Sequence, residues 1–293
     1  MPDQQIALFS DPRPDPRPPA AVNWNFWHGC TKVSPGCAHC YMYRRDEAVG
    51  RDPTVLRRTR AFRLPAEILR AGEYRGLPKI PSGSRVYTCF SSDFFHEQAD
   101  GWRREAWDMI RERSDCTFFM ITKRPEMIAS RLPDDWGGGW EHVTIAVTCE
   151  NQAMAERRLP VYLSLPLRHR AVMIEPMLTS VDLRRWLAPA PQGGPEGGLN
   201  GEPAVESVSV GGESGPDARP CDFAWVLDVR AQCAARGVAF SYHQTGARLV
   251  KDGREYRIPR ARQHEQARKA ALDLCGGGGL DEIPGESASE ESV

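Results

Sequence analysis

The stretch V-T-I-A-V-T-C-E-N-Q, residues 143–152, shows the pattern from which the fold is predicted. Its first six residues are mostly apolar and rich in β-branched side chains, which is typical of a buried strand at 143–148. The polar residues that follow predict the start of a helix that continues through Arg158. The same order, a short apolar segment followed by a helix-forming segment, recurs along the chain on both sides of this point.

The recurring segments predict an α/β protein. Further strands are predicted at residues 22–26, 85–90, 117–122, 171–174, 205–210 and 238–242, and further helices at 41–49, 65–71, 101–113, 125–131 and 223–236. Strands that alternate with helices favour a parallel sheet, because two neighbouring parallel strands need a crossover connection between them. A chain of 293 residues is long enough for such a domain.

The domain is predicted to span residues 22–250, with a Gly- and Pro-rich surface insertion at 189–203. Residues 1–21 contain six prolines and predict a disordered, extended tail. Residues 251–275 predict a helical extension with its helix at 261–274, and the Gly-rich acidic residues 276–293 predict a second disordered tail.

Composition narrows the class of protein. The net charge of -1 gives no charge-based reason for tight non-specific binding to nucleic acid. The basic run of Arg57, Arg58, Arg60 and Arg63 fits either a solvated loop or a local guide for a phosphate-bearing partner. An odd number of cysteines, nine, and no apolar core near the start favour a reducing cytoplasm. No apolar run approaches the length that spans a bilayer, so no membrane insertion is expected.

Polar residues follow the carboxyl end of every predicted strand. They are Ser91, Ser92, Asp93, Lys123, Arg124, Thr148, Glu150, Asn151, Glu175, Gly211, Gly212, Glu213, His243 and Gln244. Parallel sheets and barrels place their chemistry at this edge, so a curled sheet would bring these residues to one mouth. The serines, Asp93 and Asn151 also suit helix caps, and the glycines suit a turn. His96 fits a site residue and a helix-start residue equally well.

The first predicted strand runs into C-T-K-V-S-P-G-C-A-H-C-Y, residues 30–41, in which Cys30, Cys37 and Cys40 are spaced as C-x6-C-x2-C. Thiolates at this spacing bind zinc or an iron–sulfur cluster, and Ser34, Pro35 and Gly36 can turn the chain so that the sulfurs face one point. A closed zinc site needs a fourth ligand, which His28 or His39 can supply. A 4Fe-4S cluster on three cysteines leaves one iron open to a small molecule. On spacing alone both remain open.

Seven motifs in this order resemble a phage and bacterial protein family of unassigned function. They are W-N-F-W-H-G-C-T-K-V-S-P-G-C-A-H-C-Y, S-S-D-F-F-H-E, T-K-R-P-E, V-T-C-E-N-Q, I-E-P-M-L, V-G-G-E-S-G and the helix that contains Trp225. That family looks like a divergent branch of the radical S-adenosylmethionine (SAM) enzymes. The resemblance implies a partial (β/α)6-type parallel barrel with a 4Fe-4S cluster on the three cysteines. It implies SAM on the open iron, which would be cleaved to a 5'-deoxyadenosyl radical that abstracts hydrogen from a substrate.

The resemblance also implies roles for the residues at the strand ends. Ser91, Ser92 and Asp93 would meet the methionine amine, Lys123 or Arg124 a carboxylate, Thr148, Glu150 and Asn151 the ribose, and Gly211 and Gly212 the adenine. Glu175, Glu213, His96 and His243 remain for substrate binding or proton transfer. The chain departs from the usual pattern of the superfamily, which has three residues between the first two cysteines where this chain has six. It also has His39, a cofactor-binding candidate, where the superfamily has an aromatic residue.

The sequence therefore predicts a cytoplasmic, monomeric radical SAM enzyme that needs an electron donor such as flavodoxin or ferredoxin. Its substrate is unidentified, with a nucleotide or nucleic acid as one candidate. The alternative is a non-catalytic binding module in which zinc holds the cysteine loop.

Overall fold

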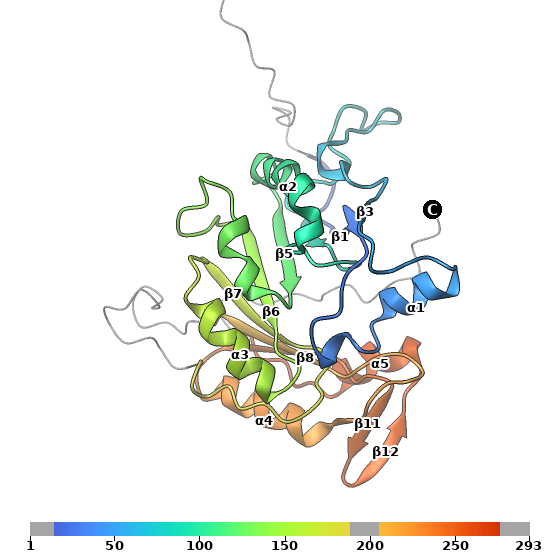
Figure 1. Ribbon diagram of the computed structural model, residues 1–293, viewed down its shortest axis with the longest axis vertical. Coiled ribbons are helices and arrows are strands. Elements are labelled where there is room, and N and C mark those ends of the chain that lie inside the picture. Colours follow the sequence, from blue (N-terminus) through green and yellow to red (C-terminus); the bar gives the residue numbers. More distant parts are fainter. Residues whose placement is uncertain (1–14, 188–204, 276–293) are drawn as a thin grey trace, which may run out of the picture.

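The computed structural model describes residues 15–187 and 205–275, and its centre is a seven-stranded parallel sheet (Figure 1). The strand order is β1-β4-β5-β6-β7-β8-β10, so strands of the sheet that follow one another along the chain are also neighbours in space. The strands are β1 (Ala21–Trp24), β4 (Arg85–Thr88), β5 (Thr117–Thr122), β6 (Val143–Thr148), β7 (His169–Ile174), β8 (Ser207–Gly211) and β10 (Ala239–Gln244). The sheet forms a half-barrel, and the prediction of an α/β fold around a parallel sheet is confirmed.

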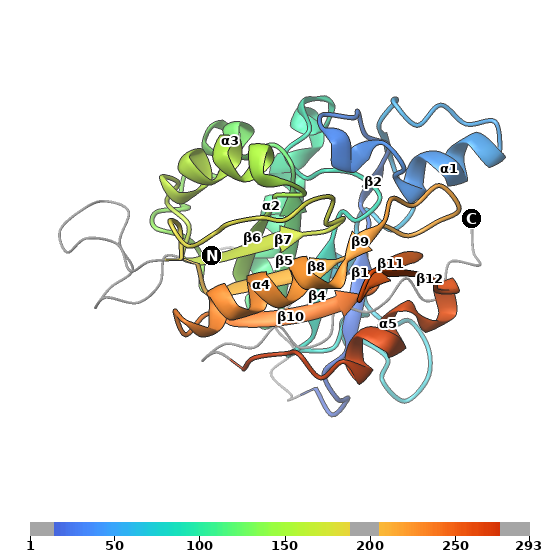
Figure 2. The ribbon, with the colours of Figure 1, turned by 90° about the horizontal axis from the view of Figure 1, so that it is seen from below.

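The outer face of the sheet carries the main core. The helices are α1 (Tyr41–Ala48), α2 (Asp100–Glu112), α3 (Gln152–Leu163), α4 (Phe223–Ala234) and α5 (Arg260–Lys269). Trp107 of α2, Leu159 of α3 and Val229 of α4 are buried in one cluster with the outward side chains of the strands. Figure 2 shows α2, α3 and α4 along the sheet. Apolar stripes on these helices cover the outer face, as a parallel sheet requires.

The inner face has a separate and smaller core. Successive side chains of β5 alternate, so that Phe118 and Met120 join the outer core while Phe119 packs inward with Tyr87 and Met173. The inward positions of β6 and β7 are filled by the small residues Ala146 and Ala171. Small side chains on one side of the half-barrel leave room within its curve.

Two predicted helices are wrong in type. Residues 65–71 form only the single 3-10 turn η2 (Leu64–Ala66), and residues 125–131 form two such turns, η4 (Pro125–Met127) and η5 (Ala129–Arg131). A segment of seven residues is too short to sustain an α-helix without tertiary support. Two further 3-10 turns, η1 (Pro35–Cys37) and η3 (Glu97–Ala99), flank the pocket described below.

Short strand pairs supplement the main sheet. β2 (Trp27–His28) pairs antiparallel with β3 (Arg57–Arg58), and β11 (Arg248–Lys251) pairs antiparallel with β12 (Arg254–Arg257) and parallel with β9 (Cys221–Asp222). The β11–β12 hairpin turns at Asp252 and Gly253, whose φ angles of 52° and 74° fit a type I′ turn. The predicted domain boundary at 250/251 is therefore wrong, because it cuts this hairpin, and the predicted helix at 261–274 is the shorter α5.

The predicted N-terminal tail is partly folded. The Ala20 amide donates to Ser84 Oγ at 3.2 Å, and Arg17 donates to the Pro78 carbonyl at 2.5 Å, so residues 15–21 pack against the segment before β4. Three predictions concern residues outside the described ranges. They are the tail at 1–14, the surface insertion at 189–203 and the tail at 276–293.

Candidate functional site

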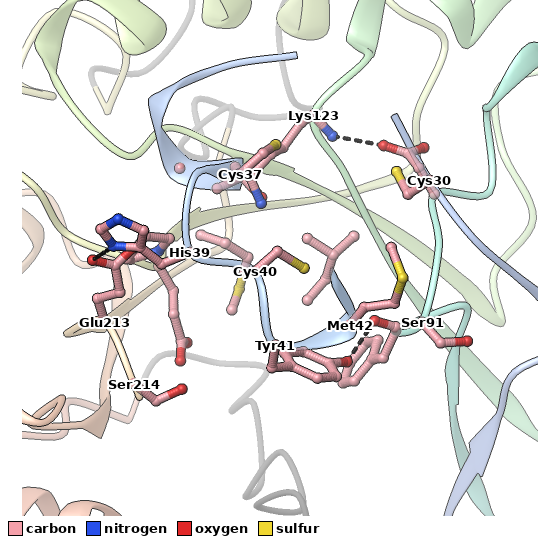
Figure 3. A pocket seen from close by; sticks show the side chains of 18 of the residues that line it. Cys30, Cys37, His39, Cys40, Tyr41, Met42, Ser91, Lys123, Glu213 and Ser214 are labelled. Carbon is pink, nitrogen blue, oxygen red and sulfur yellow. Dashed lines mark hydrogen bonds and ion pairs between the residues drawn. The ribbon is translucent and has the colours of Figure 1, made fainter. Parts of the chain in front are cut away.

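A pocket of about 260 Å³ opens at the carboxyl edge of the sheet. Its lining includes Cys30, Cys37 and Cys40 together with residues that follow β4, β5, β6, β7, β8 and β10. Figure 3 shows the three cysteine side chains around one space, with Lys123 beside Cys37. The predicted convergence of the cysteine loop and the strand ends on one mouth is therefore what the structure shows.

The start of the cysteine loop is held by backbone contacts. The Cys30 amide donates to the Pro53 carbonyl at 2.8 Å, and the Gly29 amide donates to the Ser91 carbonyl at 3.2 Å. Gly29 has a φ of 102°, which favours glycine, and a Cβ there would lie 2.5 Å from the Val55 carbonyl oxygen. These backbone contacts thus fix the position of Cys30 at the start of the loop.

Arg124 connects Cys30 to a buried carboxylate. Arg124 and Asp93 are each 4% exposed and form an ion pair of 3.1 Å between Nη1 and Oδ2. The same Nη1 lies 3.6 Å from Cys30 Sγ, and Nη2 donates to the carbonyl and the hydroxyl of Thr31, each at 2.8 Å. Burial and the nearby Asp93 raise the pKa of the Cys30 thiol to about 12, against the opposing effect of Arg124.

These contacts change the predicted use of Arg124 and Asp93. Thr122 Oγ1 and the Lys123 amide also donate to Asp93, at 2.8 and 3.1 Å, so its oxygens are occupied within the protein. Arg124 uses both of its terminal nitrogens on Asp93 and the cysteine loop. Both residues line the pocket, but their charged groups hold Cys30 and Thr31 rather than stand free for a ligand.

Glu150 lies behind the cysteine loop. It is fully buried, accepts from the Gly36 amide at 3.0 Å through Oε1, and pairs with Arg158 at 2.7 Å through Oε2. Burial by itself would raise the pKa of Glu150, but Arg158 and donors from the loop outweigh it and lower the pKa. A Cβ at Gly36 would lie 2.9 Å from the Glu150 carboxylate carbon. Glu150, predicted to reach a ribose, anchors the loop and is outside the pocket lining.

Asn151 and His96 are also outside the pocket lining. Asn151 caps α3 by accepting from the Met154 amide at 2.9 Å. His96 is fully buried, accepts from the Gln98 amide at the start of η3, and bonds Thr31 Oγ1 at 2.9 Å. Desolvation and the nearby Arg124 lower the pKa of His96, which keeps the ring neutral near pH 7. Their alternative roles, as a cap and as a helix-start residue, match this geometry.

The end of the loop has its own anchor. His39 Nδ1 lies 3.1 Å from Glu213 Oε2, and the Arg219 side chain and amide donate to the same carboxylate. Arg219 Nη2 also donates to the Pro35 carbonyl at 3.0 Å. Burial alone would raise the pKa of Glu213, but the bonds from Arg219 lower it. His39 and Glu213 both line the pocket, where they position the loop on the side of β8.

Glu175 and His243 form the opposite wall. His243 Nδ1 lies 3.0 Å from Glu175 Oε2, and Gln244 Nε2 donates to Glu175 Oε1. Burial would raise the pKa of Glu175, but His243 and Gln244 lower it, so it is an anion at neutral pH. A Cβ at Gly211 would lie 2.7 Å from the Glu175 carboxylate carbon, which explains the glycine there. Gly212 lines the pocket and packs against the Thr245 carbonyl.

Four further predicted residues line the pocket, and their polar groups differ in whether the protein already binds them. Ser91 and Ser92 line the pocket, but their hydroxyls donate to the Trp27 and Gly29 carbonyls, so they support the approach to Cys30. Thr148 is fully buried in the lining, and its Oγ1 has no hydrogen-bond partner among the described residues. Within the described ranges, no carboxylate forms an ion pair with the Lys123 ammonium. Lys123 and Thr148 are therefore the predicted residues available to a ligand.

The geometry also bears on the type of metal site. Among residues 15–187 and 205–275, no group of three or more His, Cys, Asp or Glu side chains is close enough to hold a metal ion. The three cysteines share the lining of one pocket, and zinc and an iron–sulfur cluster both take thiolate ligands.

Several residues with a part in the site were not predicted. Arg158 follows Glu150 by eight residues on α3, and a basic residue on the buried face of a predicted helix is a usable signal. Thr31 lies in the cysteine loop, but no sequence pattern marks it as a residue of the site. Arg219 and Arg260 come from segments far along the chain, and nothing in their local sequence indicates the contact.

Comparison with known proteins places the chain in a family. No curated protein and no solved structure matches it. In the described part of the chain, no helix is both long and apolar enough to cross a bilayer. One family model, described as Protein of unknown function (DUF5131), matches residues 20–284 and so covers the half-barrel, the cysteine loop and α5. The chain belongs to this family.

Proposed function

We propose that this protein is a radical SAM enzyme that binds a 4Fe-4S cluster through Cys30, Cys37 and Cys40. The observation that carries the proposal is that three cysteines of one short loop line a single pocket at the carboxyl edge of a parallel half-barrel. Thiolates are the protein ligands of iron–sulfur clusters, and this edge is where such sheets place their chemistry.

The residues present fit these groups. The three thiols share one pocket, the donor set is all sulfur, and the buried hydroxyl of Thr148 has no protein partner within the described chain. When bound, the cluster and SAM supply one-electron cleavage of the sulfonium, followed by abstraction of hydrogen from the substrate. An electron donor such as a flavodoxin or ferredoxin would reduce the cluster.

The side chains around the pocket would then have separate roles. Lys123 is the candidate partner of the carboxylate of SAM, and Thr148 can hydrogen-bond its ribose. Glu175 and His243 form a fixed pair on the wall opposite the loop, where they can bind a polar substrate or move a proton at His243. The ion pairs of Arg124 and Arg158 keep the loop in place and exclude water from behind it.

The zinc-held binding module is the competing function. It uses the same cysteines, with His28 or His39 as a fourth ligand. In the structure His28 Nε2 bonds Asp46 at 2.9 Å and His39 bonds Glu213, so each ring already has a carboxylate partner. Each ring has a second nitrogen, and a carboxylate on the other nitrogen is the usual arrangement of a zinc-bound histidine, so metal analysis decides between the two functions.

The test is anaerobic reconstitution of the full chain with iron and sulfide. We expect a brown protein with a broad absorption band near about 400 nm that dithionite bleaches, about four irons per chain, and 5'-deoxyadenosine when SAM and dithionite are added. A Cys30→Ala, Cys37→Ala, Cys40→Ala variant should lose the colour and the product. Cys275→Ala is the matched control, because Cys275 is exposed and outside the pocket lining, and it should retain both. A colourless protein with one tightly bound zinc would refute the proposal.

A further inference from the structure

The charge of the described chain is unevenly distributed. The net charge of -1 for the whole sequence includes nine acidic residues and one arginine outside the described ranges. The described residues contain 37 Lys and Arg against 30 Asp and Glu, a net charge of +7. Residues 247–270 contain eight of these basic residues and three acidic ones, so this short segment carries a net charge of +5. Most of the excess positive charge therefore lies in one place.

That place is the β11–β12 hairpin together with α5, which we call the basic extension (residues 247–270). The Ile258 amide donates to the Ala247 carbonyl at 2.9 Å, which closes the base of the hairpin. The Thr245 amide donates to the Gln263 carbonyl at 3.2 Å, which joins α5 to the end of β10. Figures 1 and 2 both show the hairpin and α5 beside each other. The basic extension is thus one structural unit attached at the carboxyl edge of the sheet.

Its charges are available to a partner. Arg254, Arg257 and Arg262 are exposed, and within the described chain no carboxylate oxygen lies within 4.0 Å of their guanidinium nitrogens. The basic run singled out by sequence behaves differently. Arg57 pairs with Asp46 at 3.0 Å, and Arg58 and Arg63 both pair with Glu105. Three of the four arginines of that run are thus paired with carboxylates. In the basic extension Arg248 pairs with Glu255 and Lys269 with Glu265, which leaves Arg254, Arg257 and Arg262 with no carboxylate within this distance.

The basic extension contributes a residue to the lining of the pocket. Arg260, the first residue of α5, lines the pocket and donates to Gln244 Oε1 at 2.6 Å. Gln244 in turn donates to Glu175, so α5 touches the wall opposite the cysteines. A chain of negative groups held by the hairpin would pass the mouth of the pocket.

We propose that the basic extension binds single-stranded nucleic acid and brings a nucleotide of that strand to the pocket. Six of its eight basic residues are arginines, whose planar fork matches phosphate oxygens. Tyr256 is 40% exposed, with Arg254 5.0 Å from its ring, and an exposed aromatic side chain among cations is a stacking platform for an unpaired base. An anionic membrane would favour several exposed apolar side chains, and Tyr256 is the one large apolar residue exposed in this extension.

Binding itself stands on the charge distribution alone, whether or not the chain holds a cluster. Only the delivery of a nucleotide as substrate rests on the proposed radical SAM function. A single strand fits better than a duplex, because a pocket of about 260 Å³ admits a base only after it has left the stack.

The experiment is fluorescence anisotropy of the full chain with labelled 20-nucleotide single strands of DNA and RNA and with a duplex of the same length. If about three phosphates are contacted, the affinity for single strands should fall about 20-fold between about 50 and 200 mM salt. Arg254→Glu, Arg257→Glu, Arg262→Glu should weaken binding at least about tenfold at the lower salt and flatten the salt dependence. Tyr256→Ala should weaken it about fivefold or more, and Tyr256→Phe should not.

The matched control is Arg70→Glu, Arg75→Glu, Arg236→Glu, which makes the same change in net charge at exposed arginines outside the extension. It should bind nearly as tightly as the natural chain. Equal loss in both triple variants would show a general charge effect and overturn the proposal. It would also be overturned by tighter binding to the duplex, or by binding to phosphatidylserine vesicles or an acidic protein with none to single strands. The Cys30→Ala, Cys37→Ala, Cys40→Ala variant should bind with unchanged affinity, which separates this proposal from the cluster.

Discussion

Paired charged side chains at the two edges of the parallel sheet differ in how deeply they are buried. At the carboxyl edge, Asp93 and Glu150 are almost or fully buried and each is paired with a buried arginine. At the amino edge, His169 pairs with Glu206 and Glu141, which are 48% and 71% exposed. Burying a charge is costly, and a pair in water contributes little. At the carboxyl edge this costly arrangement lies beside and behind the cysteine loop.

The comparison indicates which edge carries the function. The His169 pairs at the amino edge can be replaced at small cost, because water still solvates them. Those at the carboxyl edge form a connected support behind and beside a pocket. The following predictions test this difference, in order of decreasing effect.

Replacing Arg158 should have the largest effect. Arg158→Leu leaves Glu150 fully buried without its cation and should lower the free energy of unfolding by about 3–5 kcal/mol, measured by urea denaturation. Arg157→Leu is the matched control, because Arg157 is the exposed neighbour on the same helix, and its effect should stay within about 0.5 kcal/mol. Equal effects of the two variants would contradict the buried anchor.

Gly36→Ala should disturb the loop at the same anchor. The new Cβ would lie 2.9 Å from the Glu150 carboxylate carbon, so we expect a loss of about 1–3 kcal/mol in urea denaturation and lower iron content after reconstitution. Gly101→Ala is the control. A Cβ at Gly101 in α2 meets no atom within 4 Å, so this change should stabilise the protein by up to about 1 kcal/mol. Tolerance of alanine at position 36 would show that the contact is not tight.

Asn151 tests a cap against a cofactor role. Asn151→Ala removes the acceptor for the Met154 amide and should cost about 1 kcal/mol of stability, whereas Asn151→Asp keeps the cap and should cost little. If aspartate preserved stability but abolished binding of SAM, the amide would have the predicted part in holding the ribose. Thermal unfolding and equilibrium dialysis with SAM distinguish these outcomes.

His169 should have the smallest effect and a defined pH dependence. The hydrogen bond to Glu206 raises the pKa of His169 in the folded protein. The resulting stabilisation is fully present below the unfolded pKa of about 6.5 and is lost as pH rises through the raised folded pKa. His169→Gln should therefore be less stable than the natural chain by no more than about 1 kcal/mol at about pH 5.5 and equal to it at about pH 8.5. A difference that persists at the higher pH would point to packing instead.

Prediction from sequence succeeded where local pattern and burial agree. The strands at 117–122 and 143–148 were predicted to the residue, because continuous apolar segments of that length form buried parallel strands. The β11–β12 hairpin was missed, since all four residues of β12 are exposed and show no apolar alternation. Asp252-Gly253 is a recognised hairpin turn and was the signal that would have found it.

The candidate site divides in the same way. The cysteines, Lys123, Thr148, Glu175 and His243 were placed at one mouth by a rule that needs only strand order. The Thr31 groups that contact Arg124 and His96 and the Gly36 amide that contacts Glu150 come from the cysteine loop, so these contacts follow from distances that sequence does not contain. The cap made by Asn151 is local and was one of its two predicted roles.

The sequence by itself determined the parallel sheet and the gathering of three cysteines at its carboxyl edge, because these depend on apolar periodicity and on residues close together in the chain. Only the tertiary structure decided which polar side chains face the pocket and which form hydrogen bonds and ion pairs behind it. These contacts join residues up to 184 positions apart, as between Arg219 and the Pro35 carbonyl, and no local pattern records them. The net charge of +5 on residues 247–270 is in the sequence, but only the fold brings Arg260 of this segment to the pocket.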